Sequence, residues 1–317
     1  MPPVLPSDPA LRAFIEERAA FDDDLPVDAD LAVRRRAYER AAAHFRGPLP
    51  AHVLIEDLLM PGGAGHVIPA RLYRPQAAPR PAAALVFYHG GGWIYGSIDS
   101  HHDICADLAA ATGLVVVSVG YRLAPEHPFP AAFDDALAAL IYLADLGAAF
   151  AIDPARLLVG GDSAGGNLAA AVALAVRDRA LLTLCGQVLI YPALAADCSA
   201  PSYTTMAEAP LLRTADIVLM QKSYWHEVTP PNAYAAPLLA ERFDGLAPAV
   251  ITAAGLDPLH DDAPAYAERL AGAGVPVTTL IEPDLVHGHL RARSTVPTAE
   301  AAFARLCAAV RALNAAS

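Results

Sequence analysis

The sequence predicts an α/β protein with a mostly parallel, eight-stranded sheet, helices on both faces and a helical cap. Apolar runs with strand character alternate with Ala-rich helical stretches over residues 80–317, and this alternation is typical of a parallel sheet covered by helices. Two helical stretches, within residues 1–50 and 195–232, do not fit it. We expect them to lie together over the carboxyl ends of the strands, where α/β proteins bind their ligands.

The N-terminal segment is predicted to be helical and to form the first part of the cap. Leu11–Phe21 and Ala29–Phe45 place apolar residues at helical spacing, and Asp28 or Asp30 would suit the N-cap of the second helix. The run Arg34–Arg36 within this helix is most simply a solvated face, with an anion-binding site as the alternative.

Strand patterns begin near residue 52. Two such runs flank a glycine-rich turn at residues 61–65 and predict an antiparallel hairpin. Six further strands are expected after it, and the first two of them are continuous apolar runs suited to buried strands. The predicted strands are Val53–Leu59, His66–Tyr73, Ala82–Tyr88, Leu114–Val119, Leu157–Gly160, Gln187–Tyr191, Ala249–Ala253 and Val277–Ile281.

Helical patterns separate these strands and follow the last one. The predicted helices are Ile104–Ala111, Ala131–Leu146, Leu168–Val176, Arg213–His226, Ala263–Ala271 and Thr298–Leu313. Thr214 would suit the N-cap of the helix that begins near residue 213. The main domain is therefore expected to span residues 51–194 and 233–317, with the second part of the cap at residues 195–232.

The composition argues against several classes of function. The chain has 317 residues, 55% of them hydrophobic and 18% charged, with a formal net charge of −12. This acidic balance disfavours nucleic acid and anionic membrane surfaces as partners. No apolar run is suited to stable membrane insertion and no signal-peptide pattern is visible, so a cytoplasmic location is expected.

No spacing in the sequence indicates a cofactor. The four cysteines lie far apart, which favours free thiols over a disulfide framework or a zinc site. His101-His102-Asp103 is more typical of a helix start than of a metal-ligand set, and neither a phosphate loop nor a dinucleotide fingerprint is present. We therefore expect neither a metal nor an organic cofactor.

A serine stands at a sharp turn between a predicted strand and a predicted helix. Gly161-Asp162-Ser163-Ala164-Gly165 has the pattern G-x-S-x-G, which in this context predicts a nucleophile elbow. The Ser163 Oγ would stand near the helix N-terminus, where the helix dipole favours negative charge. The pattern alone is weak evidence, because an ordinary glycine-rich turn has the same letters.

Two further features supply what an exposed serine needs. His89-Gly90-Gly91-Gly92 directly follows a buried strand, and consecutive glycines let backbone N–H groups approach a developing oxyanion closely. The acid and the base of an elbow serine follow it in that order, each at a strand end. Asp257 and His287 both fall at such positions.

Four other residues compete with this acid and base. Asp261 and Asp262 look like the start of a helix. Asp284 lies away from a strand end. His289 stands two residues after the favoured histidine and is an alternative base.

Five motifs resemble those of the hormone-sensitive-lipase family of bacterial esterases, known as bacterial family IV. They are His89–Trp93, Tyr121–His127, Gly161–Asn167, Asp257–Leu259 and His287-Gly288, in the family's order over about residues 85–290. The resemblance implies the α/β-hydrolase fold, a helical cap in two parts and ester hydrolysis. Asp162 is similar to the G-D-S-A-G branch. We expect the Tyr121–His127 motif to be a rigid connector whose charged groups pair with each other and brace the glycine loop.

The resemblance also implies, position by position, six residues that act on the substrate. They are Ser163 as nucleophile, His287 as base, Asp257 as its partner, and Gly91, Gly92 and Ala164 as N–H donors to the oxyanion. The family usually has an aromatic residue where this chain has His289, which keeps the alternative base open. A homodimer through the last strand and final helix is a further expectation from the relatives.

We therefore predict a serine carboxylesterase that hydrolyses small-molecule esters through an acyl-enzyme intermediate. The resemblance favours short- to medium-chain substrates, and the candidate pocket residues are Trp93, Tyr95, Met206, Leu211 and Leu212. An amidase or lactone hydrolase with the same triad is an alternative. A non-catalytic small-ligand receptor on the same fold is another.

Overall fold

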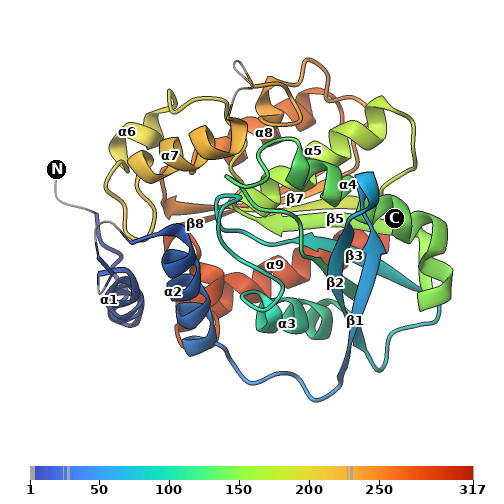
Figure 1. Cartoon of the computed structure of the whole chain (residues 1–317), viewed down its shortest axis with the longest axis horizontal. Coiled ribbons are helices and arrows are strands. Elements are labelled where there is room, and N and C mark those ends of the chain that lie inside the picture. The colour runs from blue at the N-terminus through green and yellow to red at the C-terminus, as the bar shows by residue number, and fades with distance from the viewer. Residues whose placement is uncertain (1–3, 24, 27–28, 227, 229–230, 317) are drawn as a thin grey trace.

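The computed structural model describes residues 4–23, 25–26, 29–226, 228 and 231–316. These residues form a mostly parallel sheet of eight strands (Figure 1). The strand order is β1-β2-β4-β3-β5-β6-β7-β8. β2 runs antiparallel to β1 and β4, and all other neighbours are parallel. The strands are β1 (Val53–Pro61), β2 (Val67–Pro75), β3 (Ala82–Tyr88), β4 (Val115–Val119), β5 (Ile152–Asp162), β6 (Gly186–Ile190), β7 (Ala249–Leu256) and β8 (Val277–Val286). The predicted fold class is confirmed.

β8 is longer than predicted. The apolar pattern ends at Ile281, but the pairing with β7 continues to the register pair Leu256 and Val286. β8 is an edge strand in which only Glu282, Leu285 and Val286 are buried, so its outer part lacks an apolar pattern. His287 therefore follows the strand directly.

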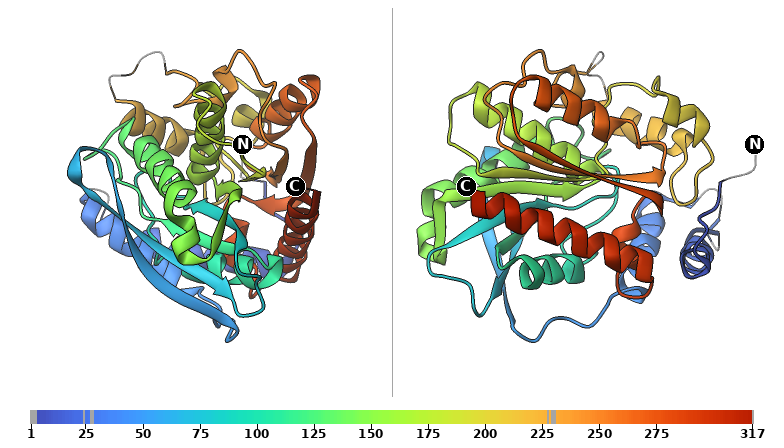
Figure 2. Two further views of the ribbon diagram at one scale, coloured as in Figure 1. Left: turned by 90° about the vertical axis from the view of Figure 1, so that its right-hand side faces the viewer. Right: turned by 180° about the vertical axis from the view of Figure 1, so that it is seen from behind.

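In the described part of the chain, five helices cover the two faces of the sheet, with α3 and α9 on one face and α4, α5 and α8 on the other (Figures 1 and 2). Their bounds are α3 (His102–Thr112), α4 (Ala131–Leu146), α5 (Ala164–Asp178), α8 (Asp262–Gly272) and α9 (Pro297–Ala316). Every residue from Ala164 to Val176 is buried. Alanine favours helix and is small, so α5 lies close to the centre of the sheet.

Four further helices of the described residues lie toward the carboxyl ends of the strands, where Figure 1 shows the blue N-terminal helices and the gold helices near the end of β8. They are α1 (Pro9–Asp23), α2 (Leu31–His44), α6 (Pro201–Thr205) and α7 (Thr214–Trp225). Asp30 is the N-cap of α2 and accepts a hydrogen bond from the Val33 N–H at 2.7 Å. The other predicted cap, Asp28, lies outside the described residues.

The N-cap of α7 corrects a prediction. Arg213 occupies that position instead of Thr214, and its side chain is held by Asp216. The Thr214 hydroxyl donates to the Tyr203 carbonyl at 2.7 Å. α6 was not predicted, because five residues are too short to show a helical period.

Short 3-10 turns complete the chain. They are η1 (Gly63–Gly65), η2 (Gly147–Phe150), η3 (Pro237–Leu239) and η4 (His289–Ala292). The four cysteines are free thiols. In the described part of the chain, no helix has both the length and the apolar character that crossing a bilayer requires.

Candidate active site

Ser163 occupies a strained turn between β5 and α5. Its φ of 54° and ψ of −117° lie where a residue with a side chain is rarely found, at a cost of about 1–3 kcal/mol. Its N–H donates to the Ile190 carbonyl at 2.8 Å, and its own carbonyl accepts from Asn167 at 3.0 Å. A side chain at Gly165 would collide with the Tyr88 carbonyl. The glycine lets the turn pack against the end of β3, and Ser163 lines the cavity there.

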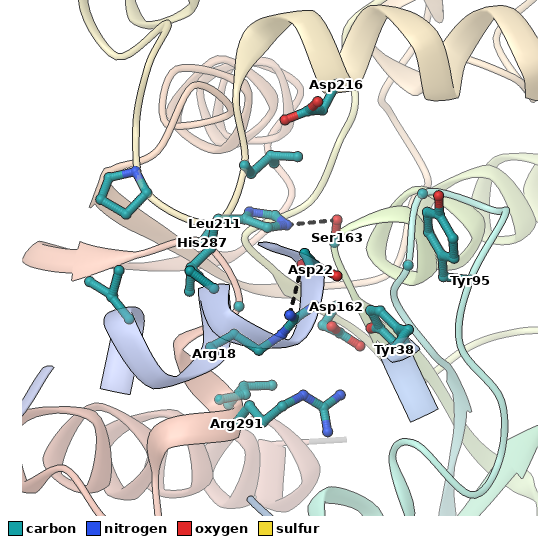
Figure 3. A pocket seen from close by; sticks show the side chains of 18 of the residues that line it. Arg18, Asp22, Tyr38, Tyr95, Asp162, Ser163, Leu211, Asp216, His287 and Arg291 are labelled. Carbon is teal, nitrogen blue, oxygen red and sulfur yellow. Dashed lines mark hydrogen bonds and ion pairs between the residues drawn. The ribbon is translucent and has the colours of Figure 1, made fainter. Parts of the chain in front are cut away.

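Asp257 and His287 meet because β7 and β8 end side by side, with Leu256 opposite Val286. The His287 Nδ1 lies 2.7 Å from the Asp257 Oδ2. The His287 Nε2 lies 2.9 Å from the Ser163 Oγ, the contact marked in Figure 3. Asp257 is fully buried, and its Oδ1 accepts from the Leu259 N–H at 2.9 Å. The three side chains therefore form one continuous series of hydrogen bonds.

The three alternative acids are engaged elsewhere. Asp261 accepts from the Ser202 N–H at 2.9 Å, and Asp284 accepts from Ser7. Asp262 accepts from two backbone N–H groups at 2.6 and 2.9 Å. Among the described residues, none of these carboxylates hydrogen-bonds a histidine of the site.

The alternative base His289 is buried on η4 and its Nδ1 lies 3.0 Å from the Val286 carbonyl. Burial lowers its pKa to about 4. The Tyr191 ring has edge contacts with both histidines, 4.9 Å from His287 and 5.0 Å from His289. Only His287 is hydrogen-bonded to Ser163.

The glycine loop lies beside the elbow because β3 and β5 are adjacent and Tyr88 pairs with Gly161. Gly91 has a φ of 124°, and a side chain there would collide with the Tyr95 carbonyl. The chain thus turns through a conformation that only glycine adopts readily. Within the described ranges, the N–H groups of Gly91, Gly92 and Ala164 have no protein acceptor. They are available to a ligand.

Asp162 joins the elbow to this loop, a contact that the sequence did not reveal. Its Oδ1 accepts from the Gly90 N–H at 2.9 Å and lies 3.3 Å from the His101 Nε2. Burial acts to raise the pKa of the Asp162 carboxyl, but the His101 charge and the hydrogen bonds from His101 and Gly90 outweigh it, so the pKa lies below its ordinary value. The carboxylate therefore stays charged beside Ser163.

The connector Tyr121–His127 braces the loop, as expected. The Tyr121 hydroxyl donates to the His89 carbonyl at 2.6 Å. The Ala124 N–H donates to the Trp93 carbonyl at 2.9 Å. These bonds hold both ends of the glycine run.

The charged groups of the connector do not pair with each other, so that expectation is wrong. Arg122 pairs with Asp135 on α4 at 2.8 Å, and Glu126 pairs with Arg35 on α2 at 2.7 Å. The prediction that Arg34–Arg36 is a solvated face is wrong at Arg35, because Arg35 forms the ion pair with Glu126. Arg36 is exposed, as predicted. The long side chains of Arg122 and Glu126 thus form their ion pairs with helices α4 and α2 and not within the connector.

A cavity of about 550 Å³ opens in front of Ser163 and His287. Tyr95, Leu211 and Leu212 line it, together with parts of α1, α2 and α7. Of the expected pocket residues, Trp93 and Met206 do not line it. Trp93 is buried and stacks on Tyr224 at 4.4 Å. Met206 packs against the apolar cluster around α1.

His101 and His102 stand at the start of α3, as predicted. His101 faces Asp162, and His102 contacts the Tyr73 hydroxyl at 2.9 Å. Across the residues that the structure describes, no group of three or more His, Cys, Asp and Glu side chains is placed to hold a metal ion.

Comparison with known proteins places this geometry in a family. The family profile described as alpha/beta hydrolase fold matches residues 85–291. The chain belongs to this family of α/β hydrolases, in agreement with the resemblance seen in its motifs.

Several relatives match over most of the chain. It is 39% identical to esterase LipI of Mycobacterium tuberculosis over 93% of this chain and 90% of that protein. It is 40% identical to ethyl acetate hydrolase of Pseudomonas putida, over 86% and 87% of the two chains. Ester-hydrolase EH1AB1 from the metagenome of Lake Arreo, solved with a derivative of bipyridine phosphonate, has a TM-score of 0.90 and 35% identity, covering 96% of this chain and 98% of that chain.

Proposed function

We propose that this protein is a serine carboxylesterase that hydrolyses small-molecule esters. The observation that carries the proposal is the hydrogen-bonded series Ser163–His287–Asp257 at a strained turn beside the cavity. The names of its relatives, an esterase and an ethyl acetate hydrolase, support the same reaction.

In the first half of the reaction, Ser163 attacks the ester carbonyl and His287 takes its proton through Nε2. Asp257 keeps the Nδ1–H oriented and stabilises the imidazolium that forms. The same histidine then protonates the departing alcohol, which leaves an acyl group on Ser163. Water attacks this acyl-enzyme with His287 as base, releasing the acid and restoring the serine.

The oxyanion of each tetrahedral intermediate is assigned to the N–H groups of Gly91, Gly92 and Ala164. Their lack of protein acceptors supports this role. They need no reorganisation when charge develops, and loss of one such donor typically costs roughly 3–4 kcal/mol of barrier. The N-terminus of α5 adds a favourable dipole at Ala164.

Substrate selection is assigned to a cap made of residues 1–50 and 195–232 over a catalytic domain of residues 51–194 and 233–317. Both parts of the cap contribute residues to the cavity wall. We propose short- to medium-chain acyl groups, and rates for p-nitrophenyl acetate, hexanoate and palmitate test this. A preference for palmitate would contradict it.

A panel of an ester, an amide and a lactone with matched acyl groups tests the reaction class. Fastest turnover of the ester supports the proposal. Turnover of the amide or lactone alone would assign the same residues to a different hydrolase. Tight binding without turnover would favour the receptor. Sedimentation velocity and cell fractionation test the homodimer and the cytoplasmic location expected from the sequence.

A further inference from the structure

The cavity beside Ser163 contains an arginine, Arg291, that forms no ion pair with a carboxylate of the described residues. Arg291 lies on η4, four residues after His287, and it lines the same cavity as Ser163 and His287. Its Nη1 donates to the Ser100 carbonyl at 2.8 Å. Within the described ranges, no Asp or Glu forms an ion pair with its guanidinium.

The other charged groups of the cavity are engaged. Three ion pairs lie in its wall, and they are Arg18–Asp22 at 2.8 Å, Arg213–Asp216 at 2.8 Å and Asp162–His101 at 3.3 Å. Arg34 donates to the Ala29 carbonyl at 3.1 Å. Among the described residues, Arg291 thus has no ion-paired carboxylate that a ligand would have to displace, although its charge acts on Asp162 in the same wall.

The surroundings of Arg291 suit a ligand that is part apolar and part anionic. The Arg291 guanidinium lies 5.8 Å from the centre of the Tyr38 ring, and the Arg18 guanidinium lies 6.0 Å from the same ring centre. Tyr38 stacks on Tyr95 at 5.8 Å. Figure 3 shows Arg291, Tyr38 and Asp162 on one side of the Ser163–His287 pair, below it in this view.

Tyr38 adds a neutral donor beside the arginine. Burial raises the pKa of its hydroxyl, and the positive charge of Arg291 only partly opposes this. The hydroxyl therefore keeps its proton. A guanidinium and a phenol side by side offer an anion charge-assisted hydrogen bonds inside a cavity with an apolar wall at Leu211 and Leu212.

We propose that the preferred substrate is an ester bearing a second, free carboxylate, and that Arg291 binds this carboxylate. The inference rests on the proposed ester hydrolysis. Water adds across the ester bond as described above, giving an acid and an alcohol, and the free carboxylate is unchanged. Because the whole protein carries a charge of −12, the preference must come from this local contact and not from long-range attraction.

Two matched pairs of substrates test the proposal. Mono-p-nitrophenyl adipate against p-nitrophenyl hexanoate places the carboxylate in the acyl part. γ-Acetoxybutyrate against butyl acetate places it in the alcohol part. The wild-type protein is expected to favour the anionic member of at least one pair in kcat/KM, and the pair that shows the preference identifies the part that Arg291 holds. A neutral preference in both pairs would overturn the inference without any variant.

Variants at Arg291 then locate the preference. Arg291→Gln should lower the anionic-to-neutral ratio of kcat/KM about tenfold or more, since a hydrogen bond to a charged group is lost. Arg291→Lys should retain most of the ratio. The paired change Arg213→Gln with Asp216→Asn removes a neutralised cavity arginine and is the matched control, with less than about threefold effect on the ratio. An equal loss on both substrates would show that Arg291 serves only to hold the Ser100 loop.

Binding provides a second measurement that does not depend on turnover. Calorimetry with Ser163→Ala and the anionic member of the pair that shows the preference should give weaker binding when Arg291→Gln is added, and unchanged binding would overturn the inference. Failure of the wild-type protein to hydrolyse any of the four esters would instead refute the proposed esterase function, so the two failures are distinguishable.

Discussion

Arg35 of α2 donates two hydrogen bonds, of 2.7 and 2.8 Å, to the carboxylate of Glu126 in the Tyr121–His127 connector. The same guanidinium donates to the Ile94 carbonyl at 2.8 Å and to the Ala124 carbonyl at 2.9 Å. One side chain of an N-terminal helix thus joins the loop after β3 to the loop after β4. Hydrogen bonds of Arg35 therefore link helix α2 to the segment that follows the glycine loop.

Arg35→Gln should therefore lower both stability and activity. We expect the free energy of unfolding to fall by about 1–3 kcal/mol, because the buried part of the guanidinium is lost and two carbonyls lose a charged donor. kcat should fall more than KM rises, since the loop that carries Gly91 loosens. Chemical denaturation and ester hydrolysis provide the measurements. Arg36→Gln, at an exposed neighbour on the same helix, is the control and should change stability by less than about 0.5 kcal/mol.

Asp162 should matter through its hydrogen bonds as well as its charge. Asp162→Ala leaves the Gly90 N–H and the His101 Nε2 without an acceptor, and an unsatisfied buried donor costs about 1–3 kcal/mol. We expect a lower melting temperature and a kcat reduced about tenfold or more. Asp162→Asn keeps an acceptor for Gly90 and should lose less. Equal, unchanged kinetics in both variants would show that the loop does not depend on this contact.

The two neighbouring histidines should behave differently. His287→Gln is expected to lose at least about 10³-fold in kcat, because the serine loses its base. His289→Gln should stay within about tenfold, since His289 contacts the Val286 carbonyl and not Ser163. The burial that lowers its pKa to about 4 also keeps it uncharged near neutral pH. The reverse ranking of kcat values would assign the base to His289.

Asp262 should make stability depend on pH. Burial raises its pKa from 3.8 to about 7, despite hydrogen bonds from Leu194, Ala195 and Tyr203. A raised pKa means that the folded state holds the proton more tightly, so the stabilisation is complete below about pH 4 and is lost as the pH rises through about 7.

Asp262→Asn cannot ionise and tests this sign. Over the range from about pH 4 to about pH 7, the wild-type protein should lose up to about 4 kcal/mol relative to the variant. Urea denaturation of both proteins at several pH values gives the difference. Parallel curves would mean that the Asp262 pKa is not raised.

Local pattern and chain order were enough to predict most of the fold. Apolar runs identified the strands, and the rule that parallel strands end at one edge predicted that Ser163, Asp257 and His287 lie near one another. The predicted end of β8 was wrong because β8 is an edge strand whose side chains are mostly not buried. β8 continues past Ile281 because its backbone pairs with β7 at Glu282 and again at Val286. This pairing does not require an alternating apolar pattern in the side chains.

The contacts that the sequence did not reveal are made by long or buried polar side chains. The partners of Arg35 and Asp162 depend on how helices and loops pack, which residue spacing does not encode. Trp93 was expected in the pocket, but it lies in the core. A positive φ of 61° accompanies its placement in the core, where it stacks on Tyr224.

The central claim is that Ser163 carries the acyl group during turnover. The most direct measurement is mass spectrometry of the protein quenched in acid during hydrolysis of p-nitrophenyl acetate, with peptide mapping of the adduct. We predict one acetyl group on the peptide that contains Ser163, and neither adduct nor significant hydrolysis with Ser163→Ala. Full activity of Ser163→Ala, or an acetyl group that maps to another residue on the reaction timescale, would contradict the account.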